Sequence, residues 1–230
     1  LLVGNQFNKT GGFVNLEGTN LKLFSDLSLT SITLPPLLIS KLSFESLDLN
    51  QKKLTLLGAE SDLEVQNQVV IDHADESLIT GDADLDLKQG LSISAGEVTS
   101  TAGTVSINGT SSLSSGTLSV FSGTLALGGS FEKNGGQFSL SDSALRLLDN
   151  LTWTSDSLLE LTELDLDNYS LTLGSDSSDL KVNNDLIMDH DNENLISGNA
   201  DLEFSGMLSI SDGEISSTGG SISMSKSLNL

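Results

Sequence analysis

Two short segments carry the residues best suited to chemistry, because they hold the only two histidines of the chain. Residues 72–76 read Asp-His-Ala-Asp-Glu and residues 189–193 read Asp-His-Asp-Asn-Glu. An imidazole beside several carboxylates can ligate a metal ion or act as a general base. The candidate ligands are Asp72, His73, Asp75, Glu76, Asp189, His190, Asp191 and Glu193. An ordinary polar corner between two apolar runs is the favoured interpretation, ahead of a shared cation and far ahead of catalysis.

A run of alternating acids forms a second candidate cation site. Asp82, Asp84 and Asp86 occupy every second position, which in a strand places their carboxylates on one solvent-facing side. Calcium prefers such oxygen ligands. An EF-hand loop is nevertheless excluded, because Leu87 stands where that loop needs glycine and Ile93 where it needs the bidentate glutamate. A solvated acidic face that keeps molecules from associating side by side is the favoured interpretation.

The composition restricts the function classes. Acidic residues outnumber basic ones 32 to 10, for a net charge of -22, so binding to nucleic acid is excluded and binding to an anionic membrane is disfavoured. The absence of cysteine excludes disulfides and thiolate chemistry. No stretch of 18 apolar residues and no leader occurs in the sequence, so we expect neither membrane insertion nor a signal peptide.

The spacing of identical residues reveals an internal repeat. At an offset of 117 residues, 31 of the 67 positions in 47–113 are identical to those in 164–230. The first 46 residues match less well but keep the same frame. The sequence therefore predicts two repeat units, 1–117 and 118–230, that form one continuous structure.

Short apolar-x-apolar runs set the expected fold. Leu85-Asp86-Leu87 and Val105-Ser106-Ile107 are examples, separated from other runs by residues that favour turns. This period of two indicates strands, too short to be stable alone. Wound as successive coils, they would bury alternate residues against the coils above and below. We therefore expect an all-β, single-stranded parallel β-helix (β-solenoid), rod-like, with about 10–12 coils of roughly 19 to 24 residues.

Two segments resemble a known family. Residues 116–129, Gly-Thr-Leu-Ser-Val-Phe-Ser-Gly-Thr-Leu-Ala-Leu-Gly-Gly, and 208–215 are similar to the repeats of large bacterial surface proteins. These are the filamentous-haemagglutinin-like and autotransporter-type β-solenoids. The resemblance implies a right-handed parallel β-helix, a bacterial source, an extracellular or cell-surface location, and a role as adhesin, stalk or fibre.

The expected function is mechanical. With neither end of the chain showing a capping element, coils are expected to stack end to end, so that the first partner is the protein itself. The alternative is a cell-surface binding module that holds a glycan or host ligand, with calcium assisting. A polysaccharide lyase or hydrolase is least favoured, because a single Trp and a single Tyr provide little surface for stacking sugars. No enzymatic activity and no obligatory cofactor are expected.

Overall fold

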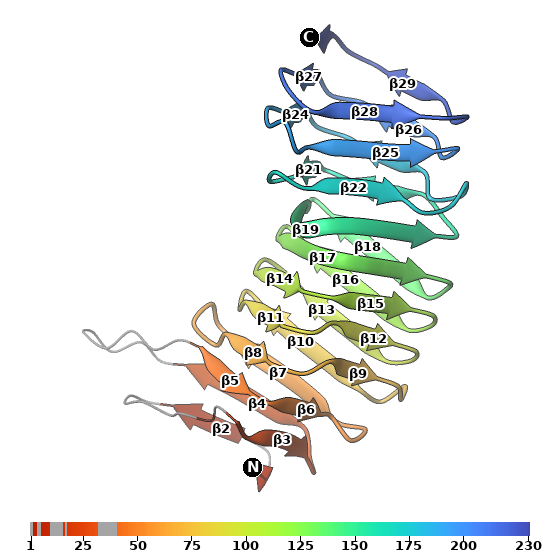
Figure 1. Ribbon diagram of the computed structural model, residues 1–230. Coiled ribbons are helices and arrows are strands. Elements are labelled where there is room, and N and C mark those ends of the chain that lie inside the picture. The colour runs from red at the N-terminus through yellow and green to blue at the C-terminus, as the bar shows by residue number, and fades with distance from the viewer. Residues whose placement is uncertain (1, 4–5, 10–15, 17, 32–40) are drawn as a thin grey trace, which may run out of the picture.

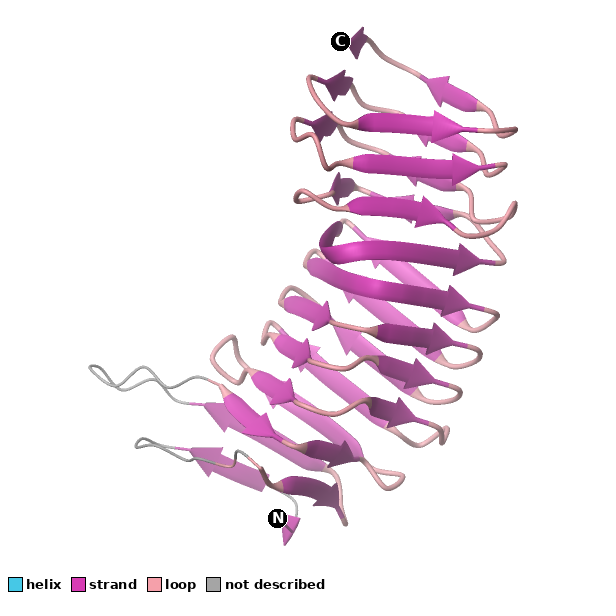
Figure 2. Ribbon diagram, viewed as in Figure 1, coloured by secondary structure: helices cyan, strands magenta, loops and turns pink. Residues whose placement is uncertain are grey.

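The protein is a rod of stacked coils. The computed structural model describes residues 2–3, 6–9, 16, 18–31 and 41–230, and these contain strands and turns but no helix (Figures 1 and 2). Hence no helix in the described part could cross a membrane. All strand pairs are parallel, as the β-solenoid prediction requires. The N- and C-terminal ends lie at opposite ends of a bent rod (Figure 1).

Each coil contributes one strand to each of three faces. The first face contains β2 (Gln6–Lys9), β4 (Leu27–Ser31), β7 (Lys53–Leu57), β10 (Ser77–Gly81), β13 (Glu97–Ser100), β16 (Thr117–Phe121), β18 (Gln137–Ser141), β20 (Leu159–Leu161), β23 (Leu180–Val182), β26 (Leu202–Phe204) and β29 (Ile222–Met224). The second contains β5 (Leu42–Phe44), β8 (Leu63–Val65), β11 (Leu85–Leu87), β14 (Thr104–Ile107), the first halves of β17 (Thr124–Lys133) and β19 (Ala144–Ser155), β21 (Glu163–Asp165), β24 (Leu186–Met188), β27 (Leu208–Ile210) and β30 (Leu228–Asn229). The third contains β1 (Leu2–Val3), β3 (Asn20–Leu23), β6 (Ser46–Asp48), β9 (Val69–Ile71), β12 (Leu91–Ile93), β15 (Thr110–Leu113), the second halves of β17 and β19, β22 (Ser170–Leu173), β25 (Asn194–Gly198) and β28 (Glu214–Ser217).

The coil winds right-handed. In Figure 1 the near strands β22, β25 and β28 run from left to right while the chain climbs from the N-terminal to the C-terminal end. This hand is the one that parallel crossover connections almost always adopt. It agrees with the hand that the family resemblance implies.

Coil length is close to the expected range. Val98 pairs with Leu118 and Leu118 with Phe138, so these coils have 20 residues. The coil from Leu54 to Leu78 has 24. In the described residues eleven strands lie on the first face and eleven on the third, which agrees with the ten to twelve coils expected.

The core is a set of side-chain columns that run along the rod. Leu63, Leu85, Val105, Leu125 and Leu145 pair in successive coils, and all are fully buried. The residues between them on each strand face outward, as in the burial pattern of β11. Burial of each such side chain is worth about 1.5–3 kcal/mol, so the alternating pattern provides the main stabilisation of the rod.

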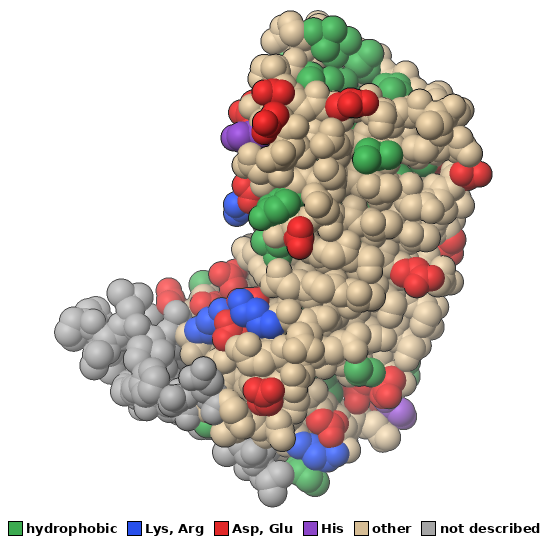
Figure 3. All heavy atoms as spheres, in the orientation of Figure 1, with side chains coloured by type: hydrophobic (Ala, Val, Ile, Leu, Met, Phe, Trp, Pro, Cys, Tyr) green, Lys and Arg blue, Asp and Glu red, His purple; other side chains and the backbone are tan. Residues whose placement is uncertain are grey.

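The two sequence repeats are out of phase with the coils. β10 lies on the first face, whereas its counterpart 117 residues later, β25, lies on the third. β25 comes 17 strand positions after β10, with three positions per coil, when β17 and β19 are each counted twice. Equivalent residues of the two repeats therefore project from different sides of the rod. Figure 3 shows this for the two histidines, which appear at opposite sides of the view.

Some glycines shared by both repeats are explained by contact between coils. Gly96 has a φ of 65°, and a Cβ at this position would lie 2.4 Å from the carbonyl oxygen of Glu76. Gly213, its counterpart, has a φ of 81° and would meet the carbonyl of Glu193 at 2.3 Å. Any side chain would therefore push the adjacent coil away.

We predict that Gly96→Ala destabilises the protein more than Gly58→Ala does. Both glycines have positive φ, which costs an alanine about 1–2 kcal/mol, but a Cβ at Gly58 has no atom within 4 Å. Steric overlap should therefore make the loss of unfolding free energy in Gly96→Ala larger than that in Gly58→Ala by about 1–3 kcal/mol. Urea unfolding of the two variants measures the difference, and equal losses would contradict the proposed contact.

Candidate functional site: the histidine corners

Both histidine corners are loops that lengthen a coil. Residues 72–76 connect β9 to β10, and residues 189–193 connect β24 to β25. At each corner the coil has 24 residues, from Leu54 to Leu78 and from Leu171 to Leu195. The two corners thus occupy equivalent places in the sequence repeat but different edges of the rod.

A buried glutamate organises each corner. Glu76 is 5% exposed, and its Oε2 accepts hydrogen bonds from the backbone N–H groups of Asp72 (2.9 Å) and His73 (3.3 Å). Its Oε1 accepts a third bond from the N–H of Gln51 in the preceding coil, at 3.1 Å. Glu193 is 3% exposed and accepts the equivalent three bonds, from Asp189, His190 and Asn168.

The glutamate bridges a break in the strand ladder. Among the described residues, β6 is paired with β3 but not with β9, and β21 with β19 but not with β24. At each break the preceding coil turns through two left-handed residues, Asn50 and Gln51 in the first repeat and Asp167 and Asn168 in the second. The carboxylate binds the exposed N–H of such a turn, as anions do in backbone nests. This structural role explains why the glutamate occurs in both repeats.

The histidines differ between the corners. His190 Nδ1 lies 2.7 Å from Asp189 Oδ1 and 3.6 Å from Glu193 Oε1, and these three side chains can bring ligand atoms within 4.8 Å of one another. His73 Nδ1 instead accepts a hydrogen bond from the N–H of Asp75 at 3.2 Å. In the described residues this grouping of three possible ligands therefore occurs only in the second repeat.

The remaining predicted ligands are exposed at these corners. Asp72 contributes its backbone N–H to the corner, while Asp75 and Asp191 have solvent-exposed side chains. The roles of Asp72, His73, Asp75 and Asp191 as ligands stay predictions. Among the described residues, the only predicted ligands that bring three ligand atoms within 4.8 Å of one another are Asp189, His190 and Glu193.

An acidic hollow surrounds the second corner. It has a volume of about 290 Å³ and lies between β21 and β24, where the strand ladder is broken. Its lining residues are Glu163, Leu164, Asp165, Asp167, Asp185, Ile187, Asp189, His190 and Glu193. Arg146 lies beside it and pairs with Asp167 at 2.7 Å and Asp165 at 3.8 Å, and these charges raise the pKa of its guanidinium. A small cation or a basic group suits such a hollow better than an anionic ligand.

The alternating acids have separate structural partners. All three point outward as expected, because the residues between them, Ala83 and Leu85, and the next residue, Leu87, are buried. Only Asp86 belongs to a strand. Asp82 accepts a hydrogen bond from the hydroxyl of Thr101. Asp84 accepts one from the backbone N–H of Thr104 at 2.7 Å. Each acid therefore has partners of its own and is not used jointly with the other two.

Asp84 belongs to a column of aspartates that the sequence pattern did not reveal. Its own N–H donates to Asp62 Oδ1 at 2.9 Å, one coil earlier. In the second repeat the N–H of Asp201 donates to Asp179 at 2.9 Å, and Asp201 accepts from the N–H of Ser221 at 2.7 Å. The hydrogen bonds from the backbone N–H and the hydroxyl of Ser221 lower the pKa of Asp201. The sequence did contain a signal for this column, because Asp62 and Asp84 both recur 117 residues later, as Asp179 and Asp201.

Asp86 is part of an ion-pair cluster. Lys41 lies 2.6 Å from Glu64 and 2.8 Å from Asp86, and Lys88 lies 2.6 Å from Asp86. Burial alone would raise the pKa of Glu64, but hydrogen bonds from Lys41 and Ser43 and the charges of Lys41 and Lys88 lower it to about 2. The equivalents of Glu64 and Asp86 in the second repeat, Lys181 and Glu203, lie on the first face. There Lys181 pairs with Glu203 and with Glu160, so the order of charges has changed.

No protein-family model, curated protein or solved structure matches the chain. The functional argument therefore depends on the residues and geometry described above.

We predict that Glu193→Gln destabilises the protein by about 1.5–3 kcal/mol, the value of a hydrogen bond to a charged group, because it removes the carboxylate that binds three N–H groups. His190→Asn should be nearly neutral. Both are compared by thermal unfolding with calcium and with chelator. If calcium instead stabilises the wild type and His190→Asn removes that effect, the corner is a cation site.

We predict that the Glu64 cluster loses stability in acid. A carboxylate with a lowered pKa stabilises the fold above the unfolded-state value, near 4.5, and this contribution disappears as the pH falls to about 2. The stability difference between the wild type and Glu64→Gln should therefore narrow over this pH interval. Urea unfolding at a series of pH values tests this, and a constant difference would show that the ion pairs contribute nothing.

Proposed function

We propose that the protein is a structural, non-enzymatic β-solenoid of an extracellular or cell-surface fibre or stalk, which lengthens by stacking coils end to end. The observation that carries this proposal is the last coil. Ile222 and Met224 on β29 are each 42% exposed, whereas their counterparts one repeat earlier, Val105 and Ile107, are fully buried. Figure 3 shows apolar side chains gathered at this end of the rod.

The buried counterparts indicate what would cover this end. Val105 pairs with Leu125 and Ile107 with Leu127 of the next coil. A further coil with the same apolar-x-apolar pattern would bury Ile222 and Met224 in the same way. Since burial of each side chain contributes about 1.5–3 kcal/mol, another coil of this kind is favoured as the occupant, from a longer tandem array or from a second copy of the chain.

The backbone supports the same arrangement. Among the described residues β29 is paired with β26 only, so its other edge has no ladder partner. An edge strand with free N–H and C=O groups pairs readily with another strand. The sides of the rod, in contrast, carry most of the net charge of -22, which opposes lateral association. The combination favours growth along the axis.

A binding module is the second candidate function. The acidic hollow around His190 supports it, because it provides a defined site for a cation or a basic group on the side of the rod. A glycan or host ligand could be held there with calcium. This function does not conflict with a structural role, since the hollow lies away from the end of the rod.

We predict that the double variant Ile222→Lys, Met224→Lys blocks end-to-end association. Lysines at an apolar contact would lose their hydration and repel one another, so association should weaken by at least about tenfold. Val70→Lys is the control, because Val70 is also exposed (46%) but lies on the side of the rod. Sedimentation and electron microscopy at increasing protein concentration measure the length of the rods. Monomeric wild type at high concentration, or unchanged assembly of the double variant, would contradict the proposal.

A further inference from the structure

One face of the rod contains a gap between consecutive coils. β18 and β20 follow each other on the first face, yet among the described residues β18 is paired with β16 only and β20 with β23 only. On the other two faces the same coils stay joined, because β19 pairs with β17 on one side and with β21 and β22 on the other. The gap is therefore a local opening in an otherwise continuous stack.

Both strands direct backbone hydrogen-bonding groups into this gap. The N–H of Gln137 donates to the carbonyl of Gly116, so residue 137 faces β16. Because successive residues of a strand point to opposite sides, the N–H and C=O groups of Phe138 and Leu140 face the gap. Likewise the N–H of Leu159 donates to Asp179, so the backbone groups of Glu160 face β18.

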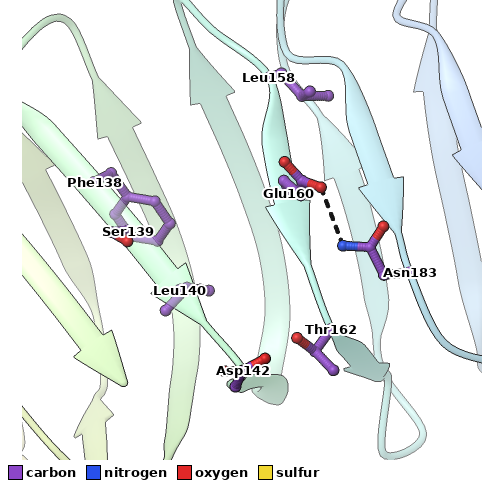
Figure 4. Close-up of a pocket in the computed structure, with 8 residues that line it drawn as sticks. All are labelled: Phe138, Ser139, Leu140, Asp142, Leu158, Glu160, Thr162 and Asn183. Atoms are coloured by element: carbon purple, nitrogen blue, oxygen red, sulfur yellow. Dashed lines mark hydrogen bonds between the residues drawn. The ribbon is translucent and has the colours of Figure 1, made fainter. Parts of the chain in front are cut away.

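The gap opens into a hollow of about 440 Å³. Its lining residues are Phe138, Ser139, Leu140, Asp142, Leu158, Glu160, Thr162 and Asn183. Figure 4 shows β18 and β20 side by side, with Asp142 and Thr162 close together at one end and Phe138 and Leu158 apart at the other. The hollow is thus widest where its lining is apolar, and it carries two carboxylates, those of Asp142 and Glu160.

An aromatic cluster lies behind the hollow. The ring of Phe138 lies 5.0 Å from that of Trp153 and 5.5 Å from that of Phe131, and Trp153 stacks on Phe131 at 4.5 Å. Trp153 is fully buried, and its indole N–H has no acceptor in the described part of the chain. Leu158, at the rim, is 51% exposed. Apolar side chains entering the hollow would therefore contact Phe138 and Leu158.

We propose that this gap binds an extended peptide segment of a partner protein by β-strand addition. The segment pairs with the free edge of β18 as a further parallel strand of that sheet, and its other edge faces Glu160 of β20. Alternate apolar side chains contact Phe138 and Leu158, and basic side chains between them face Asp142 and Glu160. Main-chain hydrogen bonds provide affinity and the side-chain pattern provides specificity in this mode of recognition. The site is independent of the end-to-end stacking proposed above.

Charge and geometry favour a peptide over other occupants. The N–H and C=O groups of Phe138 and Leu140 form a row of donors and acceptors along the edge of β18 with which an extended chain can pair. The carboxylates favour a basic segment, and the net charge of -22 would increase its rate of association. A sugar or small molecule could fill the hollow but would not pair with a strand edge.

The test uses a nine-residue synthetic peptide of alternating Lys and Val, titrated into the intact protein. Trp153 is the only tryptophan in the chain and contacts Phe138, so its fluorescence reports occupancy of the hollow. We expect a saturable change with the peptide and none with the same peptide N-methylated at alternate residues, which keeps its charge but loses N–H donors. Equal responses to both peptides would overturn the proposal.

A matched pair of variants separates the site from general attraction to an acidic rod. Glu160 and Glu203 are both about half exposed and both pair with Lys181, at 3.6 and 3.4 Å, but only Glu160 lines the hollow. Glu160→Lys should weaken binding about tenfold, whereas Glu203→Lys should change it little. An equal loss in both variants would show only non-specific electrostatic binding.

Amide hydrogen exchange provides a second readout. In the unbound protein the amides of Phe138 and Leu140 should exchange quickly and that of Ser139 slowly, because only the N–H of Ser139 faces β16. Saturation with the peptide should slow exchange at Phe138 and Leu140. Rapid exchange at both residues under saturation would exclude strand addition at β18.

Discussion

The parallel backbone ladder between successive coils is the interaction on which the rest of the structure depends. It fixes the register in which each apolar residue lies above a similar residue of the coil below, as in the column from Leu63 through Leu85 to Val105. A shift of one residue would turn every buried leucine outward. Strands of three to five residues are stable here because the ladder joins most of them to neighbours on both sides.

The polar features of the protein arise where this ladder is interrupted. At the corners, Glu76 and Glu193 bind N–H groups that no neighbouring strand reaches. Along another edge, Asp84 and Asp201 accept N–H groups from the coil above. Between β18 and β20 no described side chain bridges the open backbone edges in this way. A break that a carboxylate bridges is therefore part of the structure, whereas the unbridged gap between β18 and β20 leaves backbone groups open to a partner.

The phase difference between repeat and coil determines how surface features are distributed. The repeat of 117 residues spans five and two-thirds coils, so duplicated residues face different directions. Buried positions are unaffected, because all three faces contribute to one core. Exposed positions meet new neighbours, and this accounts for the change from Glu64 and Asp86 in one repeat to Lys181 and Glu203 in the other. The two histidine corners therefore share a structural glutamate, Glu76 or Glu193, while the contacts of His73 and His190 differ.

Much of the fold could be predicted from the sequence, because it follows from local patterns. Alternation of apolar and polar residues determined the strands and the core columns, and the distance between similar runs determined a coil length near 20 residues. The offset of 117 revealed the duplication, and the imbalance of acids determined the character of the surface. These properties depend on residue type and spacing alone.

Only the tertiary structure decided what the duplicated polar residues do. The partners of Glu76 and Glu193 are backbone N–H groups, one of them 25 residues away in the sequence, and no side-chain pattern identifies such partners. The gap beside Phe138 likewise became visible only in the pairing of the strands, because β18 and β20 are not joined to each other. The sequence by itself determined the rod, because the rod repeats a local rule. The breaks in that rod, and the sites they create, depend on contacts between coils that no local rule contains.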